Sequence, residues 1–492
     1  MLSKSKFIRG LQCPKSLWLD KYRPELRDVA SASQQARFDT GNKVGDLACQ
    51  LYPGGVEVAF NKNNYDGMVE QTQHLIAEGC KVIYEATFIE HGVLVMADIM
   101  VKNGDAWDVY EVKSSSKVSE TYIDDASIQW HVLSNALSVN RIAIIHINSD
   151  YEFDGAFLDI HQLFKIVDIT EEVLLKQQSI SQQIEVFESL LAEEAQPDVS
   201  IGQQCERPNT CDFKRYCWKD VPSPSVLDLY RMRLKDRFEL YHSGVKTFQD
   251  ISPDINLNRI QQVQVASSLS GALYIQPDVI NDYVNSLSYP IYFFDFETFM
   301  PSIPSFKGQR PFQQIPFQYS LHILHEDGEL EHREYLSEVG VDPRPGLVDK
   351  MLEDLGGQGS IVAFNQSFEI SRIQSLAAVF NDQSQALLNL IPRFSDLMQP
   401  FRALGYYDPK MNGSFSIKSI LPALFPDDPE LDYNNLVIKD GGMAMSGYEQ
   451  LQLMSDPNDL QALRQALLDY CCLDTLAMVK IYLKLSAIAK PN

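Results

Sequence analysis

The chain of 492 residues is long for a single core, so we expect two or three domains. Its 45% hydrophobic residues are typical of a globular protein, and no apolar run is long enough to predict a membrane span. The formal net charge of −24 argues against a protein that coats nucleic acid through its overall field. It leaves open an enzyme that holds phosphates through bound metal ions.

The N-terminal sequence MLSKSKFIRGLQCPKSLWL has basic residues without the apolar stretch of a signal peptide, so we interpret it as mature protein. Eight cysteines in so long a chain, without a secretory signal, do not indicate a disulfide framework. We therefore expect a cytoplasmic protein whose cysteines are metal ligands or buried thiols.

Residues 81–147 are predicted to form strands with one helix. The runs KVIYEATF and VLVMADIMV are rich in strand-forming residues, and AWDVYEVKSS follows a turn signal at Asn103 and Gly104. The segment YIDDASIQWHVLSNAL has the apolar spacing of a helix, and RIAIIHIN has the composition of a short buried strand. A long helix with a polar face is expected at 170–195. This half of the chain is therefore predicted to be an α/β domain.

Two of these strands carry a candidate metal site. Asp98 lies near the end of one strand, and Glu111 and Lys113 share a face of the next, because side chains two positions apart point the same way. Two carboxylates can hold a divalent ion that activates water, while the lysine stabilises charge developing on a phosphate. Glu85 on the preceding strand or Gln129 on the following helix would complete the site. An exposed charge pair between strands is the structural alternative.

This spacing, with an acid thirteen residues before the E-x-K pair, resembles the PD-(D/E)XK nuclease core and specifically its RecB-like exonuclease branch. The resemblance covers residues 1–220 and implies a restriction-endonuclease-like fold with one or two Mg²⁺ or Mn²⁺ ions. Relatives often carry a metal-binding histidine in an early helix. This sequence has Gly45 there, in TGNKVGDLA, and Asp46 or Glu85 is the expected substitute.

In the sequence CERPNTCDFKRYCW, five residues separate Cys205 from Cys211 and five separate Cys211 from Cys217, and Cys13 stands far upstream. This layout resembles RecB-like nucleases with an iron–sulfur cluster, including CRISPR-adaptation nucleases, and implies a structural [4Fe–4S] cluster on these four thiolates. Zn²⁺ is the alternative, although its cysteine pairs are usually closer in sequence. Four further cysteines lie in apolar segments and are expected to be core thiols: Cys49, Cys80, Cys471 and Cys472.

The sequence VPSPS at 221–225 indicates a linker, and residues 226–285 are predicted to be a small helical segment. Within it, YHSGVKTFQDI resembles a helix-hairpin-helix, a motif that can bind the DNA backbone through amides at a helix N-terminus. A spacer between domains is the alternative.

The second half again combines strands and helices. Strands are predicted at PIYFFDFET, FQYSLHIL, ELEHREYL and SIVAFN, and residues 457–489 form a strong amphipathic helix candidate. Asp295 and Glu297 share a face of the first strand. Glu369 lies in the helix after Asn365, and Tyr470 and Asp474 share one face of the last helix.

The order D-x-E, then N-x-x-x-E, then Y-x-x-x-D resembles the DnaQ-like DEDD exonucleases of the ribonuclease H-like fold, in the subclass with a tyrosine in the third motif. The resemblance covers 286–492, and SFSIKSILPAL is similar to the segment before their last helix. It implies that Asp295, Glu297, Glu369 and Asp474 hold two Mg²⁺ or Mn²⁺ ions and that Tyr470 positions the attacking water. Glu369 stands where relatives have an aspartate. Asp396 in RFSDLMQPF is either a helix cap or a competing acid for that place.

The predicted architecture is multidomain α/β, with a restriction-endonuclease-like domain at 1–220, a helical segment at 221–285 and a ribonuclease H-like domain at 286–492. The whole chain resembles a bacterial family catalogued as a domain of unknown function appended to a RecB-like nuclease. We expect a metal-dependent nuclease, in particular a 3′→5′ exonuclease on DNA ends or single strands, in repair, defence or DNA processing. An RNase and a nucleic-acid-binding scaffold with degenerate nuclease folds are the alternatives. No membrane partner is expected.

Overall fold

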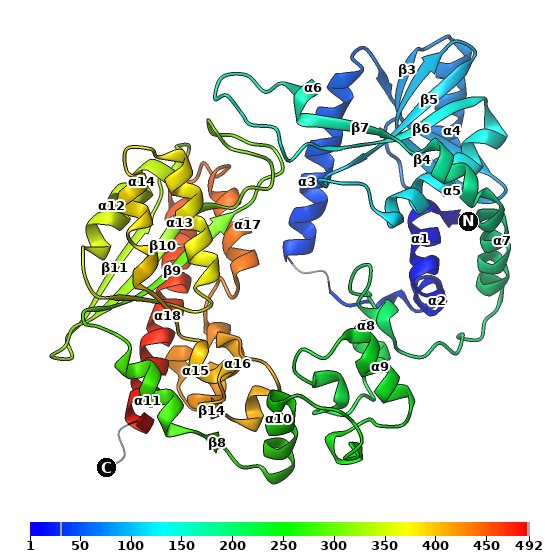
Figure 1. The fold of residues 1–492 in the computed structure, drawn as a ribbon. Helices are drawn as coiled ribbons and strands as arrows, with labels where there is room; N and C mark the ends of the chain where they lie inside the picture. Colours follow the sequence, from blue (N-terminus) through cyan, green and yellow to red (C-terminus); the bar gives the residue numbers. More distant parts are fainter. Residues whose placement is uncertain (30–31, 490–492) are drawn as a thin grey trace. The chain divides into compact units, whose positions relative to one another are not determined.

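The computed structural model describes residues 1–29 and 32–489, with the backbone path alone for 32–39. The chain divides into two compact mixed α/β units (Figure 1). The first comprises Met1–Asp220 with Pro301–Gln313, and the second comprises Val221–Met300 with Gln314–Asn492. The segment expected at 221–285 therefore belongs to the second unit.

The first unit is built on a seven-stranded sheet of order β2-β3-β4-β5-β6-β7, with β1 paired to β4. The strands β3, β4 and β5 are antiparallel neighbours, whereas β5 and β6 are parallel and are connected by a helix. The strands are β1 (Leu2–Ser3), β2 (Val56–Glu57), β3 (Val82–Glu90), β4 (Val93–Asn103), β5 (Ala106–Lys113), β6 (Val139–Ile147) and β7 (Phe164–Asp168).

Helices cover this sheet because alternate side chains of its strands are apolar on both faces. Val109 of β5 packs with Ile128 of α5 on one face, and Tyr110 packs with Val44 of α3 on the other. The helices of the unit are α1 (Lys4–Gln12), α2 (Pro14–Tyr22), α3 (Ala32–Ala48), α4 (Tyr65–Ala77), α5 (Glu120–Ala136), α6 (Ile160–Leu163), α7 (Thr170–Ala192) and α8 (Lys214–Cys217). The strands and the helix expected at 81–147 are present.

The second unit contains a five-stranded sheet of order β11-β10-β9-β12-β13. Its central strand, β9, is antiparallel to β10 and parallel to β12. A two-stranded sheet joins β8 to β14. The strands are β8 (Tyr274–Ile275), β9 (Ile291–Phe299), β10 (Ile315–Leu324), β11 (Leu330–Leu336), β12 (Ser360–Ala363), β13 (Phe394–Asp396) and β14 (Tyr406–Tyr407).

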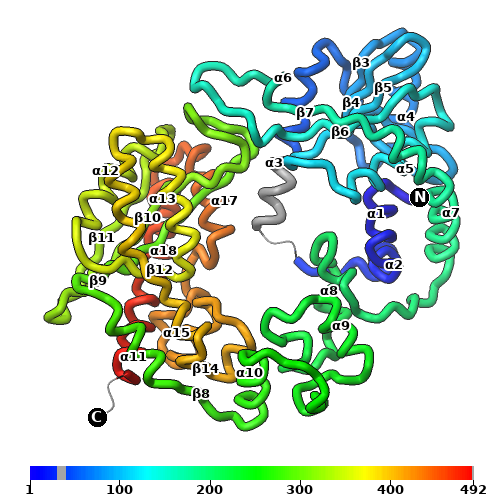
Figure 2. Tube along the Cα trace, viewed as in Figure 1, coloured from blue at the N-terminus to red at the C-terminus, as the bar shows by residue number. Residues whose placement is uncertain are grey.

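Alternation along β9 decides which face receives the acids. Phe294 packs with Val348 of α12 and Ile373 of α13 on one face, whereas Phe293 packs with Ala477 of α18 on the other. Asp295 and Glu297 have the same parity as Phe293 and therefore face α18. The helix α18 covers β9, β10 and β11, and Figure 2 traces it in red beside this sheet.

The helices of the second unit confirm the long C-terminal helix expected at 457–489. They are α9 (Leu234–His242), α10 (Arg259–Ser270), α11 (Pro277–Asn285), α12 (Pro343–Leu355), α13 (Ser367–Val379), α14 (Ser384–Leu388), α15 (Gln399–Arg402), α16 (Ile417–Leu424), α17 (Gly441–Leu451) and α18 (Pro457–Ala489).

The stretch 241–251, which resembles a helix-hairpin-helix in sequence, contains the end of α9 followed by a 3₁₀ turn, Phe248–Asp250. The Asp250 carboxylate accepts hydrogen bonds from the Thr247 amide at 2.7 Å and the Lys246 amide at 3.1 Å, which closes a single turn. Pro253 follows and disfavours continuation of the helix. The next helix begins at Arg259.

Among the described residues, no helix combines the length and the hydropathy that crossing a bilayer requires.

Candidate functional site

The second unit brings the five residues singled out in its sequence around one cavity of about 370 Å³. Asp295 and Glu297 come from the central strand β9, and Glu369 comes from the first turn of α13. Tyr470 and Asp474 lie on successive turns of α18. Strand, helix and helix therefore converge on one carboxylate cluster.

Three acids of this cluster are buried, and Asp295 is partly exposed. Glu297 is 7% exposed, Glu369 2% and Asp474 8%. Burial and the negative charge of Asp474 raise the pKa of both Asp295 and Glu297 well above the usual range. Burial also raises the pKa of Glu369 to about 8 and that of Asp474 to about 6. The repulsion between these neighbouring carboxylates is relieved when some of them bind protons or when the cluster binds cations.

Two features of this cluster suit divalent ions: its ligand atoms are carboxylate oxygens, and one of those oxygens has no hydrogen-bond partner among the described residues. Oε2 of Glu369 is buried and has no hydrogen-bond partner among the described residues. Unpartnered buried carboxylate oxygens are costly unless a proton or a cation satisfies them. Hard oxygen ligands suit Mg²⁺ and Mn²⁺. Asp295, Glu297, Glu369 and Asp474 could therefore hold such ions, and the longer side chain of Glu369 still reaches the cavity.

Two residues of this site were missed in the sequence, Tyr433 and Lys418. Tyr433 donates a hydrogen bond of 2.5 Å to Oδ1 of Asp474, which lowers the pKa of that carboxyl against the effect of burial. Lys418 of α16 also lines the cavity, with its Nζ 5.3 Å from the ring centroid of Tyr433 and 6.0 Å from that of Tyr470. Its charge favours ionisation of Glu297 and Asp474.

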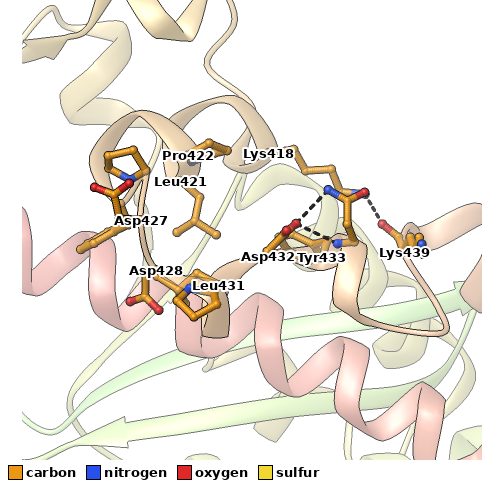
Figure 3. Close-up of a pocket in the computed structure, with 13 residues that line it drawn as sticks. Lys418, Leu421, Pro422, Asp427, Asp428, Leu431, Asp432, Tyr433 and Lys439 are labelled. Carbon is orange, nitrogen blue, oxygen red and sulfur yellow. Dashed lines mark hydrogen bonds between the residues drawn. The ribbon is translucent and has the colours of Figure 1, made fainter.

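Lys418 also lines a second cavity of about 650 Å³ next to the first (Figure 3). Its Nζ donates a hydrogen bond of 2.8 Å to the backbone oxygen of Lys439. Tyr433, Leu421 and Asp427 line the second cavity, so it has both apolar and acidic walls. The ammonium group of Lys418 thus stands between the carboxylate cluster and an adjoining pocket.

Asp396 binds backbone amides and does not line the carboxylate cavity. Its Oδ1 accepts the amide hydrogens of Asn365 and Met398, both at 2.9 Å, and Arg402 lies 3.8 Å from its Oδ2. The helix-cap interpretation is not confirmed, because the N-cap of α15 is Met398 and has no side-chain capping hydrogen bond. Glu369 is the acid that α13 presents to the cavity.

The first unit also gathers its predicted acids around one cavity, of about 760 Å³. Glu85, Asp98, Glu111 and Lys113 line it. Oδ2 of Asp98 accepts the amide hydrogen of Val112 at 2.6 Å. Gln129 lies behind the cavity, fully buried, and donates a hydrogen bond of 2.5 Å to Oε2 of Glu111. Its place in the structure is that of a residue that orients Glu111.

Two further charges in this site were missed, Lys4 and Asp125. Nζ of Lys4 lies 2.7 Å and Nζ of Lys113 lies 2.6 Å from the same oxygen of Glu111, Oε1. Lys113 also contacts Oδ2 of Asp125 at 2.6 Å. Burial disfavours the Glu111 anion, but Lys113 and Lys4 outweigh it and hold the pKa of Glu111 below its usual range.

Asp98, in contrast, is poorly neutralised. Burial and the charge of Glu111 raise the pKa of Asp98 to about 8, and burial likewise raises that of Glu85. A divalent ion bound by Asp98, Glu111 and Glu85 would compensate these charges. Gly45 and Asp46 line the same cavity, and a Cβ at Gly45 would meet no atom within 4 Å. This position thus leaves open space beside the acids.

The four cysteines of the predicted cluster line one small cavity: Cys13, Cys205, Cys211 and Cys217. Long-range hydrogen bonds bring the two chain segments together. Arg9 of α1 binds Asp212 at 2.7 Å, and Gln12 binds the backbone oxygens of Gln204 and Asn209 at 2.8 and 2.7 Å. Four thiols around one cavity suit either a [4Fe–4S] cluster or zinc.

Two thiols of this group, Cys13 and Cys217, have a raised pKa. Burial and neighbouring thiols raise the pKa of Cys13, and burial raises that of Cys217 to about 11. Metal binding would displace these protons. Of the cysteines expected in the core, only Cys471 is fully buried, while Cys49, Cys80 and Cys472 are partly exposed. Cys49 lines the cavity of the first unit.

Residues 292–416 match the family DUF2779, described as a domain of unknown function. This interval contains Asp295, Glu297 and Glu369, and it ends just before Lys418 and well before α18.

Three curated proteins are also similar to this chain. The uncharacterized protein MG366 of Mycoplasma genitalium is 25% identical over 228 residues, which is 42% of this chain and 34% of that protein. The uncharacterized protein UU173 of Ureaplasma parvum is 28% identical over 164 residues, 30% of this chain and 23% of the relative. The MG366 homolog of Mycoplasma pneumoniae is 28% identical over 216 residues, 39% of this chain and 31% of the relative. The chain thus aligns with about a third or less of each relative.

Proposed function

We propose that the second unit is a metal-dependent phosphodiesterase that removes nucleotides from the 3′ ends of DNA. One observation carries the proposal. Four carboxylates, three of them buried, and Tyr470 line a single cavity, and one carboxylate oxygen, Oε2 of Glu369, has no hydrogen-bond partner among the described residues. Such a cluster is unfavourable by itself and becomes favourable with divalent ions.

The topology supports a ribonuclease H-like fold for this unit. The first acids lie on the central strand β9. On one side of β9 lies β10, which is antiparallel both to β9 and to its other neighbour β11, and on the other side lie β12 and β13, which are parallel to β9. The last acid lies on the C-terminal helix. This is the order of the motifs on which the resemblance to DnaQ-like exonucleases rests.

Each residue of this site would have a separate role in the reaction. Bound Mg²⁺ or Mn²⁺ would activate water and stabilise the leaving oxygen. Asp295, Glu297, Glu369 and Asp474 would hold the ions. Tyr470 would orient the water by its hydroxyl group, while Tyr433 fixes Asp474 through its 2.5 Å hydrogen bond.

Lys418 would contact the substrate. Its ammonium group lies at the junction of the two cavities, where it can neutralise a phosphate without displacing a carboxylate ligand. The apolar wall of the second cavity, with Leu421 and Pro422, can receive a base or sugar. The acidic wall would disfavour a second phosphate there.

For the first unit we propose a second, RecB-like nuclease site in a restriction-endonuclease-like fold. Asp98, Glu111 and Glu85 would bind the ion, Gln129 would orient Glu111, and Lys113 would stabilise the phosphate. A cluster on the four cysteines, either [4Fe–4S] or zinc, would fasten α1 and α2 to the segment that contains Cys205–Cys217. A cytoplasmic location agrees with such thiols, because the reducing cytosol preserves them.

A binding scaffold is the second candidate for the first unit, and a specific observation favours it. Lys4 and Lys113 both contact Oε1 of Glu111, so this acid is already neutralised by the chain itself. A site of this kind could bind nucleic acid through phosphates without cleaving it. Cleavage that survives inactivation of the second unit would exclude this candidate.

The test uses the full-length protein with end-labelled single- and double-stranded DNA and RNA in the presence of Mg²⁺ or Mn²⁺. Asp295→Asn should abolish exonuclease activity, and Asp98→Asn should abolish only a separate activity of the first unit. Asp105→Asn, an exposed turn residue of the first unit, is the matched control for Asp98. RNA cleaved in preference to DNA would favour an RNase. Wild-type protein that cleaves neither polymer would contradict the proposal.

A further inference from the structure

A group of two histidines and one cysteine lies in the second unit, apart from the carboxylate cavity. His322 of β10 and His332 of β11 face each other directly across the strand pair, with ring centroids 4.4 Å apart. Cys472 reaches them from α18, which covers these strands. One ligand atom from each of the three residues lies within 4.8 Å of the others. Nitrogen, nitrogen and sulfur are the donors of many zinc sites.

Hydrogen bonds hold both rings in a fixed orientation. Nδ1 of His322 lies 2.8 Å from Oγ1 of Thr475, and Nε2 of His332 lies 3.0 Å from Oγ of Ser320. The two hydroxyl groups bind each other at 2.7 Å. One nitrogen of each ring is thereby engaged, and its second nitrogen is the one available to a metal. Metal-binding histidines commonly have such a partner on the ring nitrogen that does not bind the ion.

The protonation states agree with a metal site. Burial and the proximity of His332 lower the pKa of His322 to about 4, and burial lowers that of His332. Both imidazoles are therefore neutral at pH 7, and neutral imidazole is the form that binds metals. Burial, with the charges of Glu334 and Asp469, raises the pKa of the Cys472 thiol to about 11, so metal binding would release its proton.

We propose that His322, His332 and Cys472 bind one zinc ion, with water in the fourth position. In a tetrahedral site with bonds of about 2.0–2.3 Å, the ligand atoms stand closer together than in this structure, so small side-chain rotations would accompany binding. The softer donors distinguish this site from the all-oxygen carboxylate cluster.

A zinc ion bound at this site would hold α18 in a fixed position. The ion would join this helix to the hairpin of β10 and β11, and β11 is an edge strand of this sheet. Since Tyr470 and Asp474 lie on the same helix, each two residues from Cys472, the ion would stabilise the frame of the carboxylate cavity without contributing to it. This inference does not depend on any nuclease activity.

The experiment compares zinc bound by full-length wild type with that bound by His332→Ala and Cys472→Ser. Each protein is incubated with zinc in excess Mg²⁺, which occupies the carboxylate sites, and is desalted before metal analysis. His325→Ala is the matched control, because His325 lies in the same hairpin, outside the group of three, and its Nε2 is 3.8 Å from Oε2 of Glu331. The side chain of His332 is 29% exposed, so its removal should leave the fold intact.

We expect wild type and His325→Ala to retain one zinc equivalent more than His332→Ala and Cys472→Ser. This difference is independent of zinc held by the four cysteines of the first unit. Zinc should raise the melting temperature of the second unit in wild type and the control, but not in the two variants. Equal zinc content and equal zinc-dependent melting shifts in all four proteins would overturn the proposal.

Discussion

Tyr433 donates a hydrogen bond of 2.5 Å to Oδ1 of Asp474, although the two residues are 41 positions apart in the chain. Tyr433 lies in a 3₁₀ turn after α16, and Asp474 lies near the middle of α18. The bond fixes the last acid of the carboxylate cluster and favours its anion. A tyrosine outside the sequence motifs thus supports the site.

Tyr433→Phe should raise the Mg²⁺ concentration needed for half-maximal activity. A hydrogen bond to a charged group contributes about 1.5–3 kcal/mol, which corresponds to about 10- to 100-fold in affinity. Activity at saturating Mg²⁺ should fall much less. Metal titrations of the exonuclease rate check this. An unchanged midpoint would mean that Tyr433 does not support Asp474.

Lys418→Ala should lower kcat/KM on DNA by about 10- to 100-fold, because the side chain supplies the cation at the carboxylate cavity. Divalent ions should bind as tightly or more tightly, since a competing positive charge is gone. Lys410→Ala, at an exposed position of the same region, is the control. Parallel loss of metal binding and activity in Lys418→Ala would indicate a structural role instead.

Metal-free protein should lose stability as the pH rises from about 5 to 8. Burial raises the pKa of Glu369 to about 8, so the folded chain retains protons that the unfolded chain has released. The free energy of unfolding falls with rising pH wherever the folded state binds more protons than the unfolded state. Melting curves of the protein after dialysis against a chelator measure this slope for the second unit.

Glu369→Gln should reduce the dependence of stability on pH. At pH 8 the metal-free variant should also melt at least a few degrees above metal-free wild type. A stabilisation of about 1 kcal/mol shifts the melting temperature by about 2–4 °C in a domain of this size. Added Mg²⁺ or Mn²⁺ should stabilise wild type at pH 8 and the variant less. A variant with the same slope and the same metal response would place Glu369 outside the metal site.

Lys4→Met should increase the affinity of the first unit for Mn²⁺. The Lys4 ammonium lies 2.7 Å from Oε1 of Glu111, where it competes with a metal ion for that oxygen. Binding is measured in an Asp295→Asn and Asp474→Asn background, so that the second unit contributes little. Lys6→Met on the same helix is the control. Weaker binding in Lys4→Met would show that Lys4 supports the site rather than opposing a cation.

Local periodicity was sufficient to predict the acids of the second unit. Asp295 and Glu297 follow the two-residue repeat of a strand, and Tyr470 and Asp474 follow the turn of a helix, so each pair shares a face. Tyr433 and Lys418 have no such signal. They reach the cavity from a segment of short helices and turns, where tertiary packing decides the direction of each side chain.

The same limit applies to the first unit. Lys4 reaches Glu111 over 107 positions, and no spacing in the sequence links the first helix to the fifth strand. Asp396 illustrates a different limit, because an aspartate after a strand serves equally as a cap or as a ligand. Its two amide hydrogen bonds, from Asn365 and Met398, became evident only in the folded chain.

The most direct test of the proposed exonuclease follows a 5′-labelled single-stranded DNA with full-length protein and Mg²⁺. Wild type and Asp469→Asn, an exposed acid on α18, should shorten the strand stepwise from its 3′ end. Asp474→Asn should leave it intact, and Asp98→Asn should still shorten it. Stepwise shortening by Asp474→Asn at the wild-type rate, or none by wild type itself, would contradict the account.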